Sequence, residues 1–289
     1  MTDMTTDIAV SHPDKLLYPN ERITKAEVVD YYRDLADVMV PHLRGRPLTM
    51  HRFPDGIGAH GFFQQQASEQ FPDWLHVVEV PQRSGTGTVR HAVCDDAESL
   101  VYLANQAVLE FHIWLSTVDH LDNPDRLVID LDPPDGIRIG ELRDAVRRTC
   151  DEIDHAGLVP FVQTTGGRGF HVAAPLDATA TFDEVRAFTR DLADQLVHAH
   201  PDRFTTEQRK NKRGGRILLD TNRNAYGQTA VAPYSLRARP GAPAATPIDP
   251  DELSRVRPQK YGLGNLRHRL VSKADPWVDI ADLASPIPR

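Results

Sequence analysis

Two aspartates at the end of an apolar segment are the residues of this chain best suited to chemistry. Asp130 and Asp132 close the run Leu127–Leu131, and two prolines and a glycine follow directly. This pattern predicts a buried strand that ends in a tight turn. Side chains alternate across a strand, so both carboxylates face one side, roughly 7 Å apart. An isolated pair of this kind is more often a solvated strand end. Burial of the Asp130 backbone favours the alternative, a divalent-metal site.

Two further segments could meet this pair. Asp220 again ends a short apolar strand. Residues 164–171 contain three glycines between strands, which let backbone N–H groups approach phosphate oxygens. Arg168 and His171 add donors for the same anion. A plain hairpin turn would explain the glycines but not the flanking Thr165, Arg168 and His171.

Three carboxylates on strand ends beside an anion-binding loop predict metal-assisted chemistry on a phosphate group. Two divalent ions about 3.5–4 Å apart, held by carboxylates, are used for in-line phosphoryl or nucleotidyl transfer. Mg²⁺ binds through few carboxylates plus substrate phosphates, so an open acidic site suits a nucleoside triphosphate. The carboxylates alone fit a nuclease or phosphatase equally well. The loop and the basic run Arg203–Arg216 favour a triphosphate with a nucleic-acid strand.

Length and composition allow one large domain or two small ones. The chain has 289 residues, of which 40% are hydrophobic, and its two cysteines suggest neither a disulfide framework nor a cysteine zinc site. Without an apolar run of roughly 18 residues or a signal peptide, a cytoplasmic location is expected. The net charge of −8 argues mildly against a nucleic-acid binder. The run Arg203–Arg216, with Glu207 as its only acid, is either a local basic patch or a solvated face.

Helical and strand patterns are mixed along the chain. Capping residues and apolar spacing predict helices over 24–42, 96–109, 140–155 and 181–198. Strands are expected over 47–53, 75–80, 158–164, 169–176, 216–220 and 229–236. This mixture predicts an α+β or mixed α/β fold in a single domain over 1–289. Residues 1–10 are expected to form a loose leader and residues 240–289 an extended C-terminal wrap.

Four residues outside the acidic segments could contact a nucleic acid. Phe62 and Phe63 are adjacent in an expected strand, so they face opposite sides and one of them leaves the core, where it could stack on a base. Lys15 and Lys25 flank the loop that enters the first helix. Taken alone, such aromatics are more often core residues and such lysines are more often solvated.

Several of these segments together resemble the polymerase domain of bacterial DNA ligase D, a member of the archaeo-eukaryotic primase superfamily. The resemblance covers roughly residues 10–250 and implies the primase fold, with two packed β-sheet modules flanked by helices. The motifs that carry it, in order, are His12–Pro19, Arg52–Gly56, Phe62–Gln64, Glu110–Ser116, Leu131–Gly136, Gly166–His171, Asp220 and Ala232–Arg237.

The resemblance implies template-dependent nucleotidyl transfer that fills short gaps or extends DNA ends, with a preference for ribonucleotides. It implies Asp130, Asp132 and Asp220 as catalytic ligands of two divalent ions, Mn²⁺ or Mg²⁺. The residues implied to bind the NTP or dNTP are His112, Thr165, Arg168, His171 and Arg237. Those implied to bind DNA are Lys15 and Lys25, at a 5′-phosphate, and Phe62 and Phe63, by stacking.

The partners implied are DNA with gaps or double-strand breaks and, by analogy, the Ku end-binding protein and a separate DNA ligase. The sequence contains neither a ligase lysine motif nor a histidine-rich phosphoesterase module. The expected protein is therefore a stand-alone, monomeric polymerase that associates with the nucleoid when it binds DNA. The remaining alternatives are a metal-dependent nuclease or phosphoesterase and a non-catalytic module that binds DNA ends.

Two positions and one segment depart from the family pattern. Thr165 and Arg168 stand where the family usually has serine and lysine, and residues 221–228 contain no lysine that matches the family. Arginine keeps the positive charge but presents a planar fork of donors. A different triphosphate geometry is therefore expected at this loop.

Overall fold

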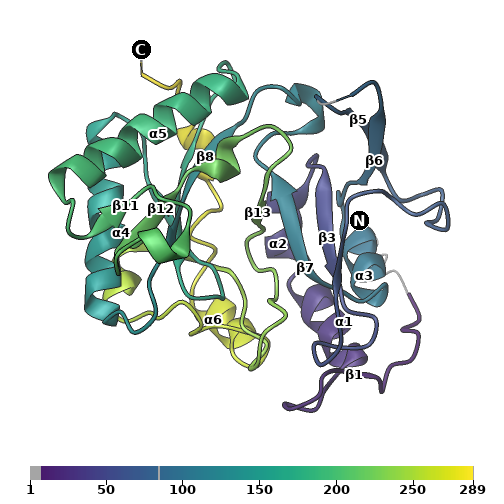
Figure 1. Cartoon of the computed structure of the whole chain (residues 1–289). Coiled ribbons are helices and arrows are strands. Elements are labelled where there is room, and N and C mark those ends of the chain that lie inside the picture. Colours follow the sequence, from purple (N-terminus) through teal and green to yellow (C-terminus); the bar gives the residue numbers. More distant parts are fainter. Residues whose placement is uncertain (1–7, 84, 289) are drawn as a thin grey trace.

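The computed structural model describes residues 8–83 and 85–288, which form two main β-sheets (Figure 1). The first sheet has the order β13 (Thr229–Val231), β7 (Val108–Trp114), β3 (Leu48–Arg52), β4 (Phe62–Gln64). The second has the order β11 (Phe204–Thr205), β12 (Ile217–Asp220), β8 (Arg126–Asp132), β10 (Phe170–Pro175), β9 (Phe161–Thr164), β14 (Thr246–Ile248). Two small hairpins add β1 (Leu16–Tyr18) with β2 (Ile23–Thr24), and β5 (Val77–Pro81) with β6 (Thr88–Ala92).

Helices lie against both sheets (Figure 1). The first sheet carries α1 (Lys25–Asp34), α2 (Ala36–Leu43) and α3 (Ala97–Asn105), and we call this half the N-terminal module. The second carries α4 (Ile139–His155) and α5 (Phe182–Ala199), and we call it the C-terminal module. Shorter elements are η1 (Val118–His120), η2 (Lys210–Lys212), η3 (Asn222–Asn224), η4 (Pro250–Ser254), α6 (Leu266–Ser272) and η5 (Ile280–Leu283). No helix among the described residues is long and apolar enough to span a bilayer.

Strand β8 has one apolar and one polar face, and this division places the acidic residues. Leu127, Ile129 and Leu131 pack in the core beneath α4 and α5. Because side chains alternate along a strand, Asp130 and Asp132 lie on the opposite face. The strands on either side follow the same pattern, since the alternate residues Ile217 and Leu219 of β12 and Phe170 and Val172 of β10 lie in the same core. The predicted strand end with two carboxylates on one face is confirmed.

The predicted helices are mostly confirmed, with two corrections. Both capping boxes are present, at Thr24 and Thr181. The helix expected over 24–42 is two helices, because the chain leaves helical geometry at Leu35. The helix expected over 96–109 ends at Asn105, so the prediction for its last turn is wrong. Ala107 has a φ of 59°, in the left-handed region, and the β-branched and aromatic residues that follow form β7.

The chain crosses between the modules more than once. After β12 in the second sheet it supplies β13 to the first, where Val231 pairs with His112, and it then returns to supply β14. The C-terminal segment contacts both modules. Ser285 bridges to Leu176 beside β10, and the Asp275 carboxylate accepts hydrogen bonds from Tyr234 (2.6 Å) and His42 Nε2 (2.7 Å). The C-terminal segment therefore ties the two halves together.

The N-terminal segment differs from the expected loose leader where it is described. Residues 1–7 lie outside the described part of the chain. Ile8 and Val10 pack against the core of the N-terminal module, and the Asn105 side-chain amide donates to the Ala9 carbonyl at 3.1 Å. Residues 8–10 are therefore docked.

We expect Asp275→Ala to lower the free energy of unfolding by about 2–4 kcal/mol. The substitution leaves the Tyr234 hydroxyl and the His42 ring without the acceptor they share, and an unsatisfied buried polar group costs roughly 1–3 kcal/mol. Urea denaturation followed by circular dichroism measures the loss. Asp282→Ala, at an exposed residue of the same segment, is the matched control and should be neutral. Equal stabilities of the two variants would contradict the tie.

Candidate active site

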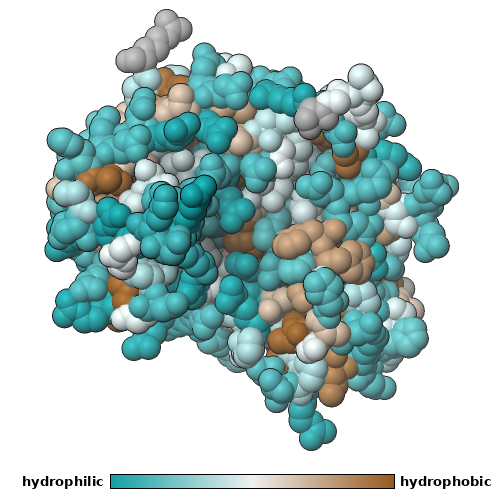
Figure 2. All heavy atoms as spheres, viewed as in Figure 1, coloured by the Kyte–Doolittle hydropathy of each residue, from teal (hydrophilic) through white to brown (hydrophobic). Residues whose placement is uncertain are grey.

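Strand register brings the three predicted aspartates together. Asp220 of β12 is the direct partner of Asp130 on β8, and His171 of β10 is the partner of Asp130 on its other side. Asp132 lies two residues along on the same face. Cβ atoms of directly opposed residues are about 4.5–5.5 Å apart. All four side chains line one cavity of about 280 Å³, and Figure 2 shows that this side of the molecule is hollowed and mainly hydrophilic there.

Basic side chains surround Asp130 in this cavity. His171 Nε2 and the Arg223 guanidinium each lie 3.6 Å from Asp130 Oδ2. Burial alone would raise the pKa of Asp130, but these positive charges outweigh it and hold the pKa below its ordinary value. Asp130 is therefore an ionised carboxylate within a partly enclosed site. Arg223 lies in the segment 221–228, where the family lysine is missing, and a search for any cation there would have found it.

Asp132 and Asp220 have polar partners that sequence reasoning did not single out. Arg213 donates to Asp132 Oδ2 at 2.7 Å, and Arg168 lies 3.3 Å from the other oxygen of the same carboxylate. Gln208 donates to Asp220 Oδ1 at 3.2 Å. Arg213 belongs to the basic run 203–216, and this run was the sequence feature from which a basic partner of the aspartates could have been predicted. The run is not one continuous patch, because only some of its side chains point into the cavity.

The glycine-rich loop between β9 and β10 is tightly built against the site. The Thr165 hydroxyl donates to the Gly169 carbonyl at 2.9 Å and accepts from the Gly167 amide at 3.2 Å. A Cβ on Gly169 would lie 1.9 Å from the Leu131 carbonyl oxygen, so no other residue fits beside β8. Thr165, Gly167 and Arg168 all line the cavity. Arg168 is also paired with Asp135, at the turn after β8.

Glu110 on β7 organises the wall that the N-terminal module contributes. Its carboxylate is buried and is hydrogen-bonded to His112 Nε2 at 3.0 Å, and it lies within ion-pair distance of His51 Nδ1 (3.3 Å) and Arg237 Nε (3.2 Å). Burial alone would raise the pKa of Glu110, but these contacts outweigh it and hold the pKa well below its ordinary value. Arg237 also donates to the Thr165 carbonyl at 2.6 Å. Glu110 therefore links the sheet of one module to the glycine-rich loop of the other.

The two phenylalanines are both exposed, on the edge strand β4. Phe63 stacks on His51 with ring centroids 3.9 Å apart, and it makes a T-shaped contact with His112 with ring centroids 5.7 Å apart. The Arg52 guanidinium lies over Phe62, 5.6 Å from the ring centroid. The expectation that only one ring leaves the core is wrong, because Phe62 and Phe63 are both exposed although they lie on opposite faces of β4. His112 lines the cavity, so Phe63 continues the site outward along the N-terminal module.

Lys15 and Lys25 lie elsewhere in the N-terminal module and do not line the cavity. Lys25 is buried and donates to the Ser11 hydroxyl at 2.6 Å, whereas Lys15 pairs with Asp55 at 2.7 Å. Burial lowers the pKa of Lys25, and the charges of Lys15 and Arg52 lower it further. Cations that repel one another in this way form a favourable site for an added anion.

The donor set fits divalent metal ions. Three carboxylates from adjacent strands are hard oxygen ligands of the kind that Mg²⁺ and Mn²⁺ prefer. Among the described residues, no three His, Cys, Asp or Glu side chains are already close enough to form a complete metal site. Asp132 is instead contacted by Arg213 and Arg168. A bound cation would therefore compete with these two guanidinium groups for Asp132.

Comparisons with known proteins identify the family. Residues 24–277 match the family described as LigD, primase-polymerase domain. This chain belongs to that family. The polymerase domain of Mycobacterium tuberculosis Ligase D, solved in complex with DNA, superposes with a TM-score of 0.88 at 30% identity, covering 96% of this chain and 99% of that one. The resemblance and the fold class predicted from the sequence are thereby confirmed.

Longer relatives contain this unit as a part. The multifunctional non-homologous end joining protein LigD of Pseudomonas aeruginosa is 33% identical over 281 residues, which are 96% of this chain and 33% of that protein. The bifunctional non-homologous end joining protein LigD of Bacillus subtilis is 30% identical over 271 residues, 92% of this chain and 43% of that protein. The chain thus spans about a third to two fifths of the length of these relatives.

We expect Glu110→Gln to lower the pKa of His112 below its value in the unmodified protein. Burial already lowers the pKa of this imidazole, and the Glu110 carboxylate opposes that effect by stabilising the protonated ring. Removing the negative charge leaves burial unopposed. Histidine titration by NMR measures the change. Glu141→Gln, at an exposed residue of α4, should leave the titration of His112 as it is. A rise in the pKa, or no change, would contradict the role assigned to Glu110.

Proposed function

We propose that this chain is a template-dependent nucleotidyltransferase that extends a nucleic-acid strand at gaps or ends in DNA. The observation that carries the proposal is the row Asp220–Asp130–His171 across three adjacent strands, beside Asp132 and a glycine-rich loop. This arrangement combines acidic metal ligands with hydrogen-bond donors for phosphate oxygens in one cavity, as nucleotidyl transfer requires. The family assignment favours polymerisation over the nuclease alternative, which the carboxylates alone would also fit.

Asp130, Asp132 and Asp220 would hold the divalent ions. When bound, such ions neutralise phosphate charge and activate the attacking hydroxyl. The role of the chain is to fix the three carboxylates on strands that are packed from behind by α4 and α5. The choice between Mn²⁺ and Mg²⁺, and the number of ions, belong to this proposal.

His112, Thr165, Arg168, His171 and Arg237 would bind the triphosphate of the incoming nucleotide. All five line the cavity. Backbone N–H groups of the glycine-rich loop and the arginine forks supply donors for phosphate oxygens. Arginine in place of the usual lysine at position 168 lets one side chain span Asp132 and Asp135. The substrates proposed are NTPs and dNTPs, with NTPs preferred.

The N-terminal module would bind the DNA. Phe62 and Phe63 present exposed rings for stacking on a template base, and Phe63 is in contact with the cavity residue His112. Stacking on aromatic rings tolerates any base sequence. Lys15 and Lys25 would receive the 5′-phosphate on the far side of a gap. The structure of the M. tuberculosis relative is that of a polymerase domain in complex with DNA, which supports a DNA ligand.

The names of the longer relatives favour a role in non-homologous end joining. In that setting the proposed substrates are double-strand breaks with 5′-phosphates, and the proposed partners are Ku and a DNA ligase activity. We propose that the unit acts as a monomer on the nucleoid in the cytoplasm.

We expect Asp132→Ala to reduce extension of a gapped, 5′-phosphorylated DNA with NTPs and Mn²⁺ by at least about a thousandfold, corresponding to about 4 kcal/mol of transition-state stabilisation. Gel analysis of extension under single-turnover conditions measures the rate. Asp191→Ala, at an exposed residue of α5, is the matched control and should keep full activity. Wild-type rates in Asp132→Ala would refute the metal assignment. Degradation of the DNA without any requirement for nucleotide would instead identify a nuclease.

We expect Lys25→Gln to lower about tenfold the ratio of the affinity for a 5′-phosphorylated gap to the affinity for a 5′-hydroxyl gap. The reason is that hydrogen bonds to charged groups contribute about 1.5–3 kcal/mol. Competition binding between the two DNAs, followed by fluorescence anisotropy, measures the ratio. The 5′-hydroxyl DNA is the internal control and should bind the variant as it binds the unmodified protein. A preference that survives in Lys25→Gln would remove this lysine from the phosphate site.

A further inference from the structure

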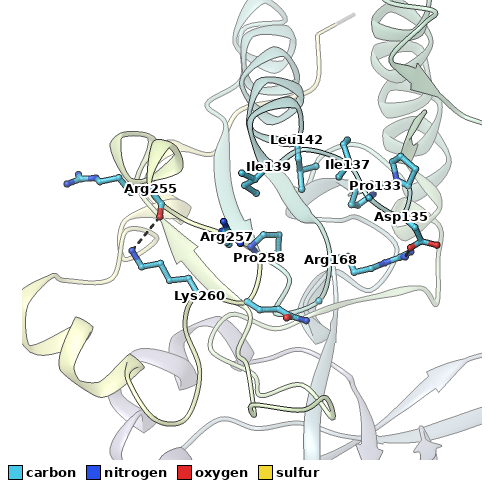
Figure 3. A pocket seen from close by; sticks show the side chains of 14 residues that line it. Pro133, Asp135, Ile137, Ile139, Leu142, Arg168, Arg255, Arg257, Pro258 and Lys260 are labelled. Atoms are coloured by element: carbon cyan, nitrogen blue, oxygen red, sulfur yellow. Dashed lines mark hydrogen bonds and ion pairs between the residues drawn. The ribbon is translucent and has the colours of Figure 1, made fainter. Parts of the chain in front are cut away.

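A second pocket, of about 740 Å³, adjoins the catalytic cavity. We call it the outer pocket. It is formed by the turn after β8, the start of α4 and the segment after η4 (Figure 3). Gly167 and Arg168 line both this pocket and the catalytic cavity, so the two adjoin at the glycine-rich loop. Its volume lies within the roughly 300–1,000 Å³ that is typical of ligand sites.

The interior of the outer pocket is apolar. Pro133 follows β8, Ile139 and Leu142 belong to the first turn of α4, and Pro258 approaches from the C-terminal segment. Figure 3 shows Ile137, Ile139 and Leu142 side by side along one wall, with Pro258 facing them. Such a surface suits a flat group with apolar faces.

Positive charge is concentrated around the opening. Arg168, Arg255, Arg257 and Lys260 line the pocket, and Asp135 is the only acid that does so. Asp135 is already paired with Arg168, and Arg255 has only a weak contact with Asp251, at 3.8 Å. Within residues 8–83 and 85–288, neither Arg257 nor Lys260 has a carboxylate within 4.0 Å. In a chain with a net charge of −8, this is a local site for an anion.

We infer that the outer pocket binds a nucleotide unit of a single DNA or RNA strand whose neighbouring part occupies the catalytic cavity. An apolar interior matches the faces of a base, and a basic rim matches the phosphates on either side of it. Arg257 and Lys260 are three residues apart on the rim and Arg168 lies across the pocket, so the cations are placed for successive phosphates more than for one compact group (Figure 3).

Adjacency to the catalytic cavity favours a strand over a free nucleotide. A strand passing over Gly167 and Arg168 enters the cavity at Asp132, which Arg168 contacts at 3.3 Å. The inference rests on the proposed polymerase function, in which the strand that is extended must reach the carboxylates of the cavity. It adds a binding subsite on the C-terminal module, away from Phe62, Phe63, Lys15 and Lys25.

The test uses the full chain with the double substitution Arg257→Gln and Lys260→Gln. Binding of a short fluorescein-labelled poly-dT strand is followed by anisotropy over a range of salt concentrations, without metal or nucleotide. We expect about a tenfold weaker affinity, and a salt slope reduced by about 1.4, since each phosphate contact on a single strand contributes about 0.7. The matched control is Arg147→Gln with Arg190→Gln, which removes the same charge from exposed positions on α4 and α5 and should bind as the unmodified protein.

A third variant tests the interior. Ile137→Asp places a negative charge on the wall of the pocket without altering the rim, and it should weaken strand binding as well. Unchanged affinity and salt slope in both outer-pocket variants would overturn the inference. Loss of ATP binding in these variants, with strand binding retained, would also overturn it, because the pocket would then be a site for a free nucleotide.

The result can be separated from failure of the proposed function. If the unmodified protein extends DNA, the rim variant should raise KM for the DNA about tenfold and leave KM for the nucleotide unchanged. If the unmodified protein never extends DNA, the polymerase proposal fails. The anisotropy comparison still decides whether the outer pocket binds a strand. Equal increases in both KM values would indicate a general disturbance of the cavity and would count against a separate strand subsite.

Discussion

The alternation of side chains along β8 is the constraint on which the site depends. Leu127, Ile129 and Leu131 must face the helices, because their burial anchors the central strand of the larger sheet. Asp130 and Asp132 are then fixed on the other face, without helices to cover them. A shift of one residue in register would bury both carboxylates in an apolar core. The same hydrophobic pattern that stabilises the sheet therefore holds Asp130 and Asp132 in place.

The second requirement is the joining of two modules. The cavity takes its carboxylates and glycine-rich loop from the C-terminal module, and His112 from the N-terminal one. Arg237 contacts Glu110 in one module and the Thr165 carbonyl in the other. A buried ionic cluster of this kind is not needed for net stability, since apolar replacements often stabilise as well. It fixes one orientation of the modules, which a metal-assisted site needs more than it needs additional stability.

Local pattern was enough to predict the strands that carry Asp130 and Asp220, because burial of one face imposes a period of two. It was also enough for the two capping boxes, because the signal for each lies within four consecutive residues. The local pattern did not predict the early end of the helix before Ala107. This residue has a left-handed backbone conformation, which is usually indicated in a sequence by glycine, and no glycine is present there. The local pattern also missed Glu110 as the centre of the cluster, because the four groups that meet there are up to 186 residues apart in sequence, from His51 to Arg237. Their proximity is a property of the sheet order, and the order β13-β7-β3-β4 does not follow from any local pattern.

Charge balance explains why so many arginines point toward three aspartates. Asp130, Asp132 and Asp220 would repel one another in a small cavity unless cations offset them. Arg213 and Arg168 contact Asp132, and Arg223 and His171 contact Asp130. Bound divalent ions would take over this neutralisation. The guanidinium groups would then be available to phosphate oxygens, which enter the cavity with the opposite charge. The same side chains can thus stabilise the carboxylates before a substrate binds and the phosphates afterwards. This dual role explains why arginine, whose guanidinium has several donors, lines the wall of the site.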